Sequence, residues 1–213
     1  MQRLPPQADY IFRGHQDDVN CVRFFNSDKY IASCDAGGTV IVWLFQTRRP
    51  VFQWKAHTAS CLCVHVYNQD KLVSQGRDDR IYVWHLDFAT DQSPQVVYTL
   101  PYYSLNFCQL SLYQTKVDRT LICFPSKGDT PLVDIYDLTD QRWVVQSIGD
   151  QDNAKRRLCM TVQFLPCDND DVVHLLVGYE SGDAALWQCH LGSTETTLLW
   201  QAHLHDKPGK STP

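Results

Sequence analysis

Three side chains near the middle of the sequence are those of a hydrolase triad: His57, Ser74 and Asp78. An imidazole held between a carboxylate and a hydroxyl can activate that hydroxyl as a nucleophile. Triads are nevertheless recognised by geometry and by roles, because the residue types alone are common. These three residues stand at fixed places within a structural repeat, described below. We therefore predict a structural hydrogen-bond network and no enzyme.

Two other groups of residues resemble binding motifs but lack part of the pattern. Cys61, Cys63 and His65 alternate along one predicted strand and could ligate a metal. Cys61 takes a core position of the repeat, however, and no second ligand pair has zinc spacing. Gly209-Lys210-Ser211 is similar to the end of a phosphate loop, but Leu204 stands where that loop requires glycine. The sequence thus predicts no metal and no cofactor.

The composition excludes several classes of protein. A chain of 213 residues with 44% hydrophobic and 20% charged residues is too apolar for intrinsic disorder, so we expect a packed core. A net charge of -5, with no basic run longer than Lys155-Arg156-Arg157, argues against direct binding to nucleic acid. The N-terminal residues lack the apolar stretch of a signal peptide, and no apolar run is long enough to span a membrane. We expect a cytoplasmic and nuclear protein that binds no membrane.

The nine cysteines are an odd number and include no CxxC pair. A disulfide framework normally uses an even number of cysteines in a secreted chain. We interpret these residues as small buried hydrophobes.

The pattern of short apolar runs predicts strands throughout. Runs of β-branched and aromatic residues are bounded by Gly, Asp or Asn every eight to twelve positions, and no helical stripe is found. Three segments of equal length each read as strand, tight turn and strand ending in tryptophan: Ile31–Trp43, Leu72–Trp84 and Leu175–Trp187. A degenerate fourth copy fits between the second and third, with Tyr136 in place of the tryptophan.

The repeat resembles the WD40 family. The two tryptophans Trp43 and Trp84 lie 41 positions apart, and WD40 repeats have a period of about 40 to 45 residues. A WD40 blade resembles a four-stranded antiparallel sheet held by a hydrogen-bond chain of Asp, His, Ser and Trp. That resemblance makes His57, Ser74, Asp78 and Trp84 a complete tetrad, and His15, Ser33 and Trp43 a partial one in which Gly37 stands at the Asp position. The last repeat keeps only Trp187.

Counting the strands predicts an all-β, incomplete and open propeller. Four complete blades are expected, with an orphan outer strand at Tyr10–Arg13 in front and a stub of a fifth repeat from Gln201 behind. Such a chain could be a splice variant or a fragment. The expected organisation is a flexible N-terminus over 1–9, a partial propeller over 10–203 and a disordered tail over 204–213, with blades at about 14–54, 56–100, 101–148 and 154–201.

Within the WD40 family, three stretches are similar to the G-protein β-subunit-like protein 1 family, which is related to ASTRA-associated protein 1: Leu44–Val51, Leu72–Trp84 and Leu176–Trp187. The resemblance implies a non-enzymatic interaction scaffold. It also implies protein partners in the TTT co-chaperone machinery that matures phosphatidylinositol-3-kinase-related kinases. The alternative is a G-protein β-like subunit in signalling, which would need an N-terminal coiled-coil helix to hold its γ subunit.

Three arginines are the candidate contacts with partners. Arg77 precedes the tetrad residue Asp78 in the turn between two inner strands, where the WD40 resemblance implies that side chains are presented on the top face of the propeller. Arg48 and Arg49 lie in a loop at the opposite end of the first blade. Arginine is enriched at the energetic centres of interfaces, and we predict that these three contribute to partner binding.

Overall fold

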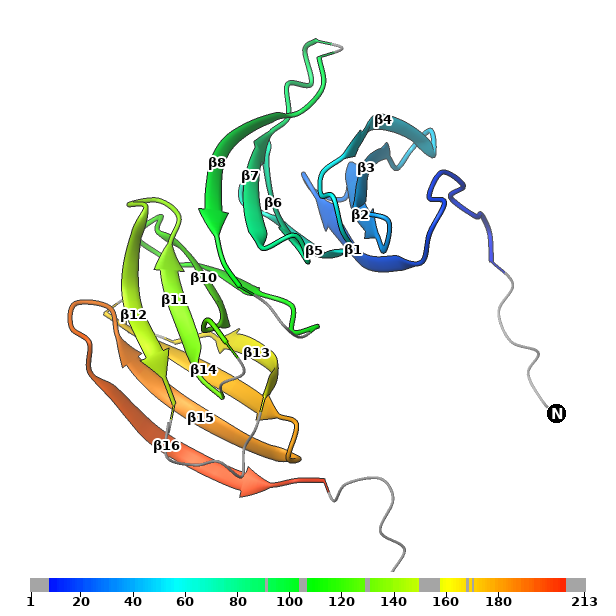
Figure 1. Ribbon diagram of the computed structural model, residues 1–213. Helices are drawn as coiled ribbons and strands as arrows, with labels where there is room; N and C mark the ends of the chain where they lie inside the picture. The colour runs from blue at the N-terminus through cyan, green and yellow to red at the C-terminus, as the bar shows by residue number, and fades with distance from the viewer. Residues whose placement is uncertain are drawn as a thin grey trace, which may run out of the picture.

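The structure is a computed structural model that describes residues 8–90, 92–103, 107–128, 131–149, 158–167, 169 and 171–205. The described residues form four antiparallel sheets of four strands (Figure 1). Blade one comprises β1 (Val19–Phe25), β2 (Tyr30–Asp35), β3 (Thr39–Leu44) and β4 (Arg49–Lys55). Blade two comprises β5 (Cys61–Val66), β6 (Lys71–Gly76), β7 (Arg80–His85) and β8 (Gln95–Pro101). Blade three comprises β9 (Ser111–Gln114), β10 (Thr120–Pro125), β11 (Val133–Asp137) and β12 (Arg142–Ile148). Blade four comprises β13 (Cys159–Leu165), β14 (Val172–Tyr179), β15 (Asp183–His190) and β16 (Thr196–His203).

Tight turns fix the register of the inner strands. The residue just before β3, β7 and β15 has a left-handed backbone: Gly38, Asp79 and Gly182 have φ of 85°, 60° and 90°. A Cβ on Gly38 would also lie 2.3 Å from the carbonyl oxygen of Ala59. Glycine tolerates this conformation without steric cost, which explains the Gly-rich turns of the repeat.

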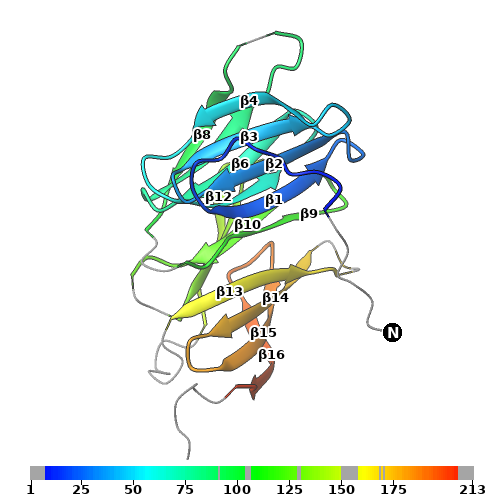
Figure 2. The ribbon, with the colours of Figure 1, turned by 90° about the vertical axis from the view of Figure 1, so that its right-hand side faces the viewer.

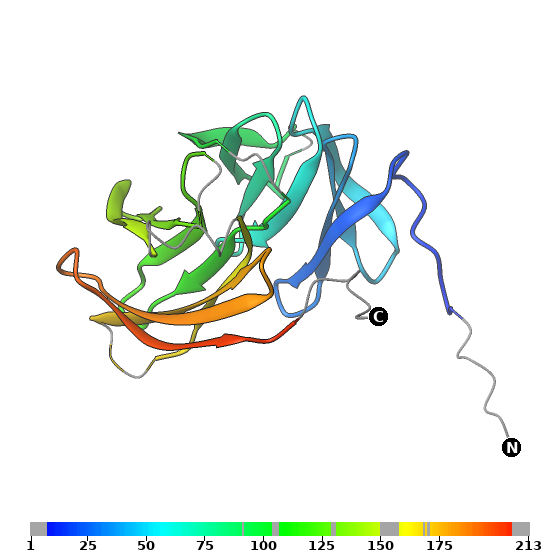
Figure 3. The ribbon, with the colours of Figure 1, turned by 60° about the horizontal axis from the view of Figure 1, so that its bottom comes forward.

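The blades follow one another in chain order along an arc (Figure 1). Figures 2 and 3 show the same sheets turned about the vertical and the horizontal axis. One core cluster joins blades one, two and part of three, and a second joins blades three and four. The first strand of each blade lies innermost, since β1 packs against β5 and β9 packs against β13. No helix of the described residues is long and apolar enough to cross a membrane.

The architecture confirms the all-β, open WD40-type fold: the four sheets do not close into a ring. The prediction of an outer strand at Tyr10–Arg13 is wrong, because these residues form no strand in the structure. A strand needs a hydrogen-bonded neighbour, and β1–β4 pair only with each other. The prediction that a fifth repeat begins at Gln201 is also wrong, because residues 201–203 are the last residues of β16 in blade four. Residues 1–7 and 206–213, which make up most of the predicted flexible N-terminus and disordered tail, lie outside the described residues.

Candidate functional site

Blade two contains a continuous chain of polar side chains. His57, in the connection from β4 to β5, places Nδ1 2.8 Å from Oδ1 of Asp78 and Nε2 2.7 Å from Oγ of Ser74. The indole Nε1–H of Trp84 donates to the same Ser74 oxygen at 2.8 Å. The other Asp78 oxygen accepts the backbone N–H of Thr58 at 2.9 Å. The structure therefore brings all four residues of the sequence-predicted tetrad into one network.

The geometry makes this network structural. A carboxylate only accepts, so Nδ1 of His57 carries the proton and Nε2 accepts the Ser74 hydroxyl. His57 and Ser74 are buried, with exposed fractions of 2% and 0%. Burial lowers the pKa of His57, against the opposing effect of Asp78, and so favours the neutral ring. No substrate reaches a hydroxyl that is fully buried and already hydrogen-bonded on both sides.

Blade one corrects the sequence prediction. His15 contacts Oγ of Ser33 at 2.7 Å, and Trp43 donates to that oxygen at 2.8 Å. The carboxylate comes from Asp35, whose Oδ2 lies 2.6 Å from Nδ1 of His15. Gly37 was expected to leave this network without an acid. Asp35 stands two residues earlier in the chain and its side chain reaches the same imidazole, so blade one has a full network.

Among the described residues, blades three and four lack the network. Tyr136 occupies the tryptophan position of blade three, and its hydroxyl is hydrogen-bonded to the hydroxyl of Tyr98 on β8. In blade four Trp187 is buried and its Nε1 has no hydrogen-bond partner in the described residues. The position that corresponds to Ser74 is Val177, which cannot accept a hydrogen bond.

Aromatic contacts between consecutive blades were missed from the sequence. Each joins the outer strand or segment before a blade to the aromatic residue one position before the end of the blade's third strand. Phe12 meets Trp43 with ring centroids 5.4 Å apart, Trp54 meets Trp84 at 5.5 Å, and Tyr98 meets Tyr136 at 6.2 Å. The signal was present, because an aromatic residue stands three positions before His15, His57 and His203. The segment around Phe12 thus covers blade one as β4 covers blade two, although it is not a strand.

The cysteine and histidine pattern on β5 belongs to the core. Cys61 and Cys63 are fully buried, and burial raises the pKa of the Cys63 thiol well above its usual range. Burial, with a smaller contribution from Arg23, lowers the pKa of His65 to about 4. Among the described residues, no group of three or more His, Cys, Asp or Glu side chains could hold a metal ion. Gly209-Lys210-Ser211 lies outside these residues.

Arg77 lies on the end of the sheets that carries the turns between the second and third strands. Its guanidinium carbon sits 4.4 Å from the ring centroid of Phe107, and the exposed fraction of Phe107 is 65%. At the same end, Nζ of Lys127 lies 4.3 Å from the ring centroid of Tyr103, which is 50% exposed. These two cation–aromatic pairs form an exposed surface, which we call the Arg77 surface. Large exposed rings beside cations are typical of interface residues.

Arg48 and Arg49 lie at the opposite end of blade one and have different surroundings. The guanidinium carbon of Arg48 lies 4.7 Å from the ring centroid of Tyr10, and the residue has a left-handed backbone. Arg48 therefore holds the N-terminal segment against blade one. Arg49 begins β4 and is exposed.

Comparisons with known proteins agree with this architecture. The family model for the WD domain, G-beta repeat, matches residues 7–43. The chain is 30% identical to ASTRA-associated protein 1 of Yarrowia lipolytica, over 89% of this chain and 47% of that protein. It is 25% identical to the protein of that name from Penicillium rubens, over 97% of this chain and 54% of the relative. The chain spans about half the length of the curated relatives it matches.

A solved structure shows the same fold. The computationally designed Ika4 protein superposes with a TM-score of 0.61 at 18% identity, covering 86% of this chain and 98% of that one. At this identity the likeness concerns the fold alone.

Proposed function

We propose that this chain, a WD40-repeat protein, is a non-enzymatic scaffold that binds partner proteins through the Arg77 surface. The observation that carries the proposal is the contrast between two groups of polar residues. Of the triad-like residues, His57 and Ser74 are buried and Asp78 is half-buried, and the three are hydrogen-bonded to one another. Arg77 and Phe107, in contrast, are exposed at one end of the sheets. The exposed residues can therefore contact a partner protein, whereas the buried network is occupied by its own hydrogen bonds.

The relatives support a proposal for the class of partner. Their name, ASTRA-associated protein 1, supports a role in ASTRA-type assemblies. The family resemblance supports TTT co-chaperone complexes and phosphatidylinositol-3-kinase-related kinases as the partners, in the cytoplasm and nucleus. The chemistry of the surface favours an acidic partner segment with an apolar or aromatic neighbour, since Arg77 offers a cation beside an exposed ring.

The test is affinity purification of the tagged full chain from cells, with quantitative mass spectrometry. We expect Arg77→Glu to reduce recovery of its principal partners by at least about fivefold, because a buried or half-buried arginine contact is typically worth 1–2 kcal/mol or more. Phe107→Ala should reduce the same partners.

Arg142→Glu is the matched control, because Arg142 begins β12 at the opposite end of the sheets and its side chain is 53% exposed. Unchanged partners in the Arg77→Glu variant would refute the proposal. Recovery of a G-protein γ subunit in place of kinase-maturation chaperones would replace it with the signalling role.

A further inference from the structure

One fully buried polar side chain belongs to the strand that leads to Arg77. Gln75 lies on β6, two positions before Arg77, and its exposed fraction is 0%. A buried primary amide needs hydrogen-bond partners for its oxygen and for its nitrogen, because unsatisfied polar groups are costly inside a protein. The partners of this amide therefore show what the side chain holds in place.

The Gln75 amide binds the segment that carries Phe107. Its Oε1 accepts the backbone N–H of Leu110 at 2.8 Å, and its Nε2 donates to the carbonyl oxygen of Cys108 at 3.2 Å. The thiol of Cys63 donates to the same Oε1 at 3.2 Å. Two of these three bonds thus go to main-chain atoms of the connection between blades two and three. The side chain holds that connection against blade two.

Residues 107–110, which we call the 107–110 segment, alternate between exposed and buried side chains. Cys108 and Leu110 are buried, with exposed fractions of 0% and 2%, whereas Phe107 is 65% exposed. The segment is not a strand, and it leads directly into β9 of blade three. Its alternation is that of an extended chain, in which successive side chains point in opposite directions. Holding the main chain at Cys108 and Leu110 therefore directs the Phe107 ring outward.

Two further side chains attach the same connection to blade two. The hydroxyl of Tyr102, which is 3% exposed, donates to the carbonyl oxygen of Gly76 at 2.8 Å. Gln109 donates from Nε2 to the carbonyl oxygen of Leu62 at 2.9 Å. Tyr102 precedes Phe107 in the chain and Gln109 follows it, so side-chain anchors lie on both sides of the exposed ring.

These anchors set the contact between the cation and the ring of the Arg77 surface. The guanidinium carbon of Arg77 lies 4.4 Å from the ring centroid of Phe107. Arg77 belongs to the turn between β6 and β7, whereas Phe107 belongs to the connection between blades two and three. Their contact therefore depends on how that connection lies on blade two. A surface that is ordered before binding avoids the free-energy cost of ordering a loop and its side chains on binding.

We propose that Gln75 is a positioning residue of the partner-binding site, with Gln109 as a weaker second anchor. Gln75 contacts no partner. It holds Phe107 beside Arg77, so that the Arg77 surface is formed before a partner binds. The inference rests on the proposed scaffold role and deepens it, because it assigns part of the affinity of that surface to a buried residue. Its structural part, the holding of the 107–110 segment, is measurable without any partner.

The first measurement is hydrogen–deuterium exchange of the purified full chain, followed by mass spectrometry, in the wild type and in Gln75→Met. Methionine has a similar volume but no amide, so the variant loses the acceptor of the Leu110 N–H. We expect peptides that span the 107–110 segment to exchange at least about tenfold faster in the variant, while peptides from blade four keep their wild-type rates. An unchanged rate in the 107–110 segment would overturn the proposal.

A second variant keeps the test decisive if Gln75→Met lowers the stability of the whole chain. Gln109 is exposed, so Gln109→Met removes its bond to Leu62 without disturbing the core. We expect about twofold faster exchange in the 107–110 segment alone. Faster exchange in every blade for Gln75→Met, together with no change for Gln109→Met, would mean that these residues support the fold in general, which contradicts the proposal.

The second measurement is a double-mutant cycle on the recovery of partners. The probe is the set of proteins that the tagged wild-type chain recovers from cells and that Arg77→Glu loses. We expect Gln75→Met to reduce their recovery at least about threefold. Added to Phe107→Ala, it should cause no further loss, because the position of a missing ring no longer matters. Losses that multiply would show that Gln75 acts apart from Phe107 and would overturn the proposal.

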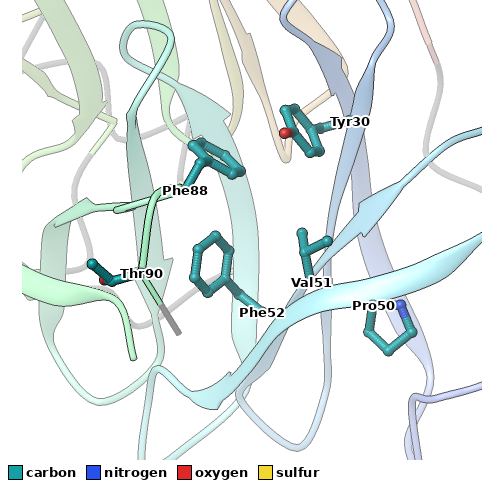
Figure 4. A pocket seen from close by; sticks show the side chains of 6 residues that line it. All are labelled: Tyr30, Pro50, Val51, Phe52, Phe88 and Thr90. Atoms are coloured by element: carbon teal, nitrogen blue, oxygen red, sulfur yellow. The ribbon is translucent and has the colours of Figure 1, made fainter. Parts of the chain in front are cut away.

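Two controls match these substitutions in chemistry. Gln188→Met removes a half-buried glutamine from β15 in blade four. Phe88→Ala removes a 37% exposed ring from the opposite end of the sheets, where it lines a shallow pocket with Tyr30 and Phe52 (Figure 4). Neither should change exchange in the 107–110 segment or the recovery of partners.

The failure of this inference differs from the failure of the proposed function. Loss of partners in Arg77→Glu and Phe107→Ala, but not in Gln75→Met, would retain the scaffold role and remove Gln75 from it. Unchanged partners in Arg77→Glu would refute the proposed function and the positioning role together.

Discussion

Blades two and four have the same strand order, and both have a buried tryptophan on their third strand, yet only blade two connects that indole to a hydrogen-bond network. Trp84 donates to Ser74, whereas Trp187 is buried with its Nε1 unpartnered in the described residues. Blade four still forms four paired strands with β14 and β15 matched over seven residue pairs. The comparison teaches that apolar packing and strand pairing are sufficient to specify the blade, and that the polar network is an addition.

The polar network also makes blade two sensitive to substitution. A satisfied buried network stabilises a blade, but removing one member leaves the others buried and unpaired. Blade two should therefore be sensitive to changes that blade four tolerates, and three measurements test this difference.

The largest expected effect is that of His57→Leu in blade two. Removing the imidazole leaves the Asp78 carboxylate and the Ser74 hydroxyl without their shared partner, so we expect the free energy of unfolding to fall by about 3 kcal/mol. Urea denaturation measures it. The control is His85→Leu, since His85 pairs with Asp70 at the surface and both side chains are more than a third exposed. That change should cost less than about 1 kcal/mol. Equal losses in the two variants would show that the buried network contributes no more to stability than a surface ion pair.

An intermediate effect is expected on acidification. Two histidines of the blade-two region, His57 and His65, have a pKa lowered by burial, to about 4 for His65. Their contribution is complete above the unfolded pKa of about 6.5, and stability falls as the pH decreases from there toward the lowered values, because the unfolded chain binds more protons. Between pH 7 and pH 5, His65 alone should cost about 1–2 kcal/mol.

The measurement is urea denaturation at the two pH values, in the wild type and in a His65→Leu variant. The variant should lose less stability on acidification, which separates this histidine from the carboxylates. A stability that rises toward pH 5, or an identical loss in both proteins, would contradict the assignment.

The smallest effect is expected for Val177→Ser in blade four. The substitution removes apolar burial worth about 1.5 kcal/mol but gives Trp187 an acceptor worth about 1 kcal/mol, so the net change should stay within about 1 kcal/mol. Slower exchange of the Trp187 indole N–H in D₂O, followed by NMR, would report the new bond. A loss above 2 kcal/mol with no change in exchange would mean that the serine does not reach the indole.

Sequence reasoning predicted the features that depend on local pattern. Alternating apolar residues and Gly-rich turns placed the inner strands, and the predicted segment Ile31–Trp43 contains most of β2 and β3. The tetrad of blade two followed from the resemblance to WD40 repeats, because its four residues stand at the spacing of that family. These features depend on neighbours in the chain, so a single sequence is sufficient to find them.

Features that depend on side-chain reach or on neighbouring blades were not predicted. Asp35 was missed because the spacing rule placed the acid at Gly37, while a carboxylate nearer the serine meets the same imidazole. The stacking of Phe88 on Tyr30 was not predicted, because Phe88 lies in the connection between β7 and β8 and Tyr30 stands 58 positions away in the sequence. The segment Tyr10–Arg13 has the place in the chain of an outer strand in front of blade one, but place in the chain does not specify hydrogen bonding, and the segment forms no strand.

The two positions of the acid have a consequence for recognising such repeats. Asp35 follows its serine by two residues and Asp78 follows its serine by four, yet both carboxylates bond the same atom of the histidine. A search template with one fixed acidic column scores blade one as degenerate although its network is complete. Templates that accept the carboxylate in either column, provided that the His, Ser and Trp columns are filled, would describe the interaction that the sequence encodes.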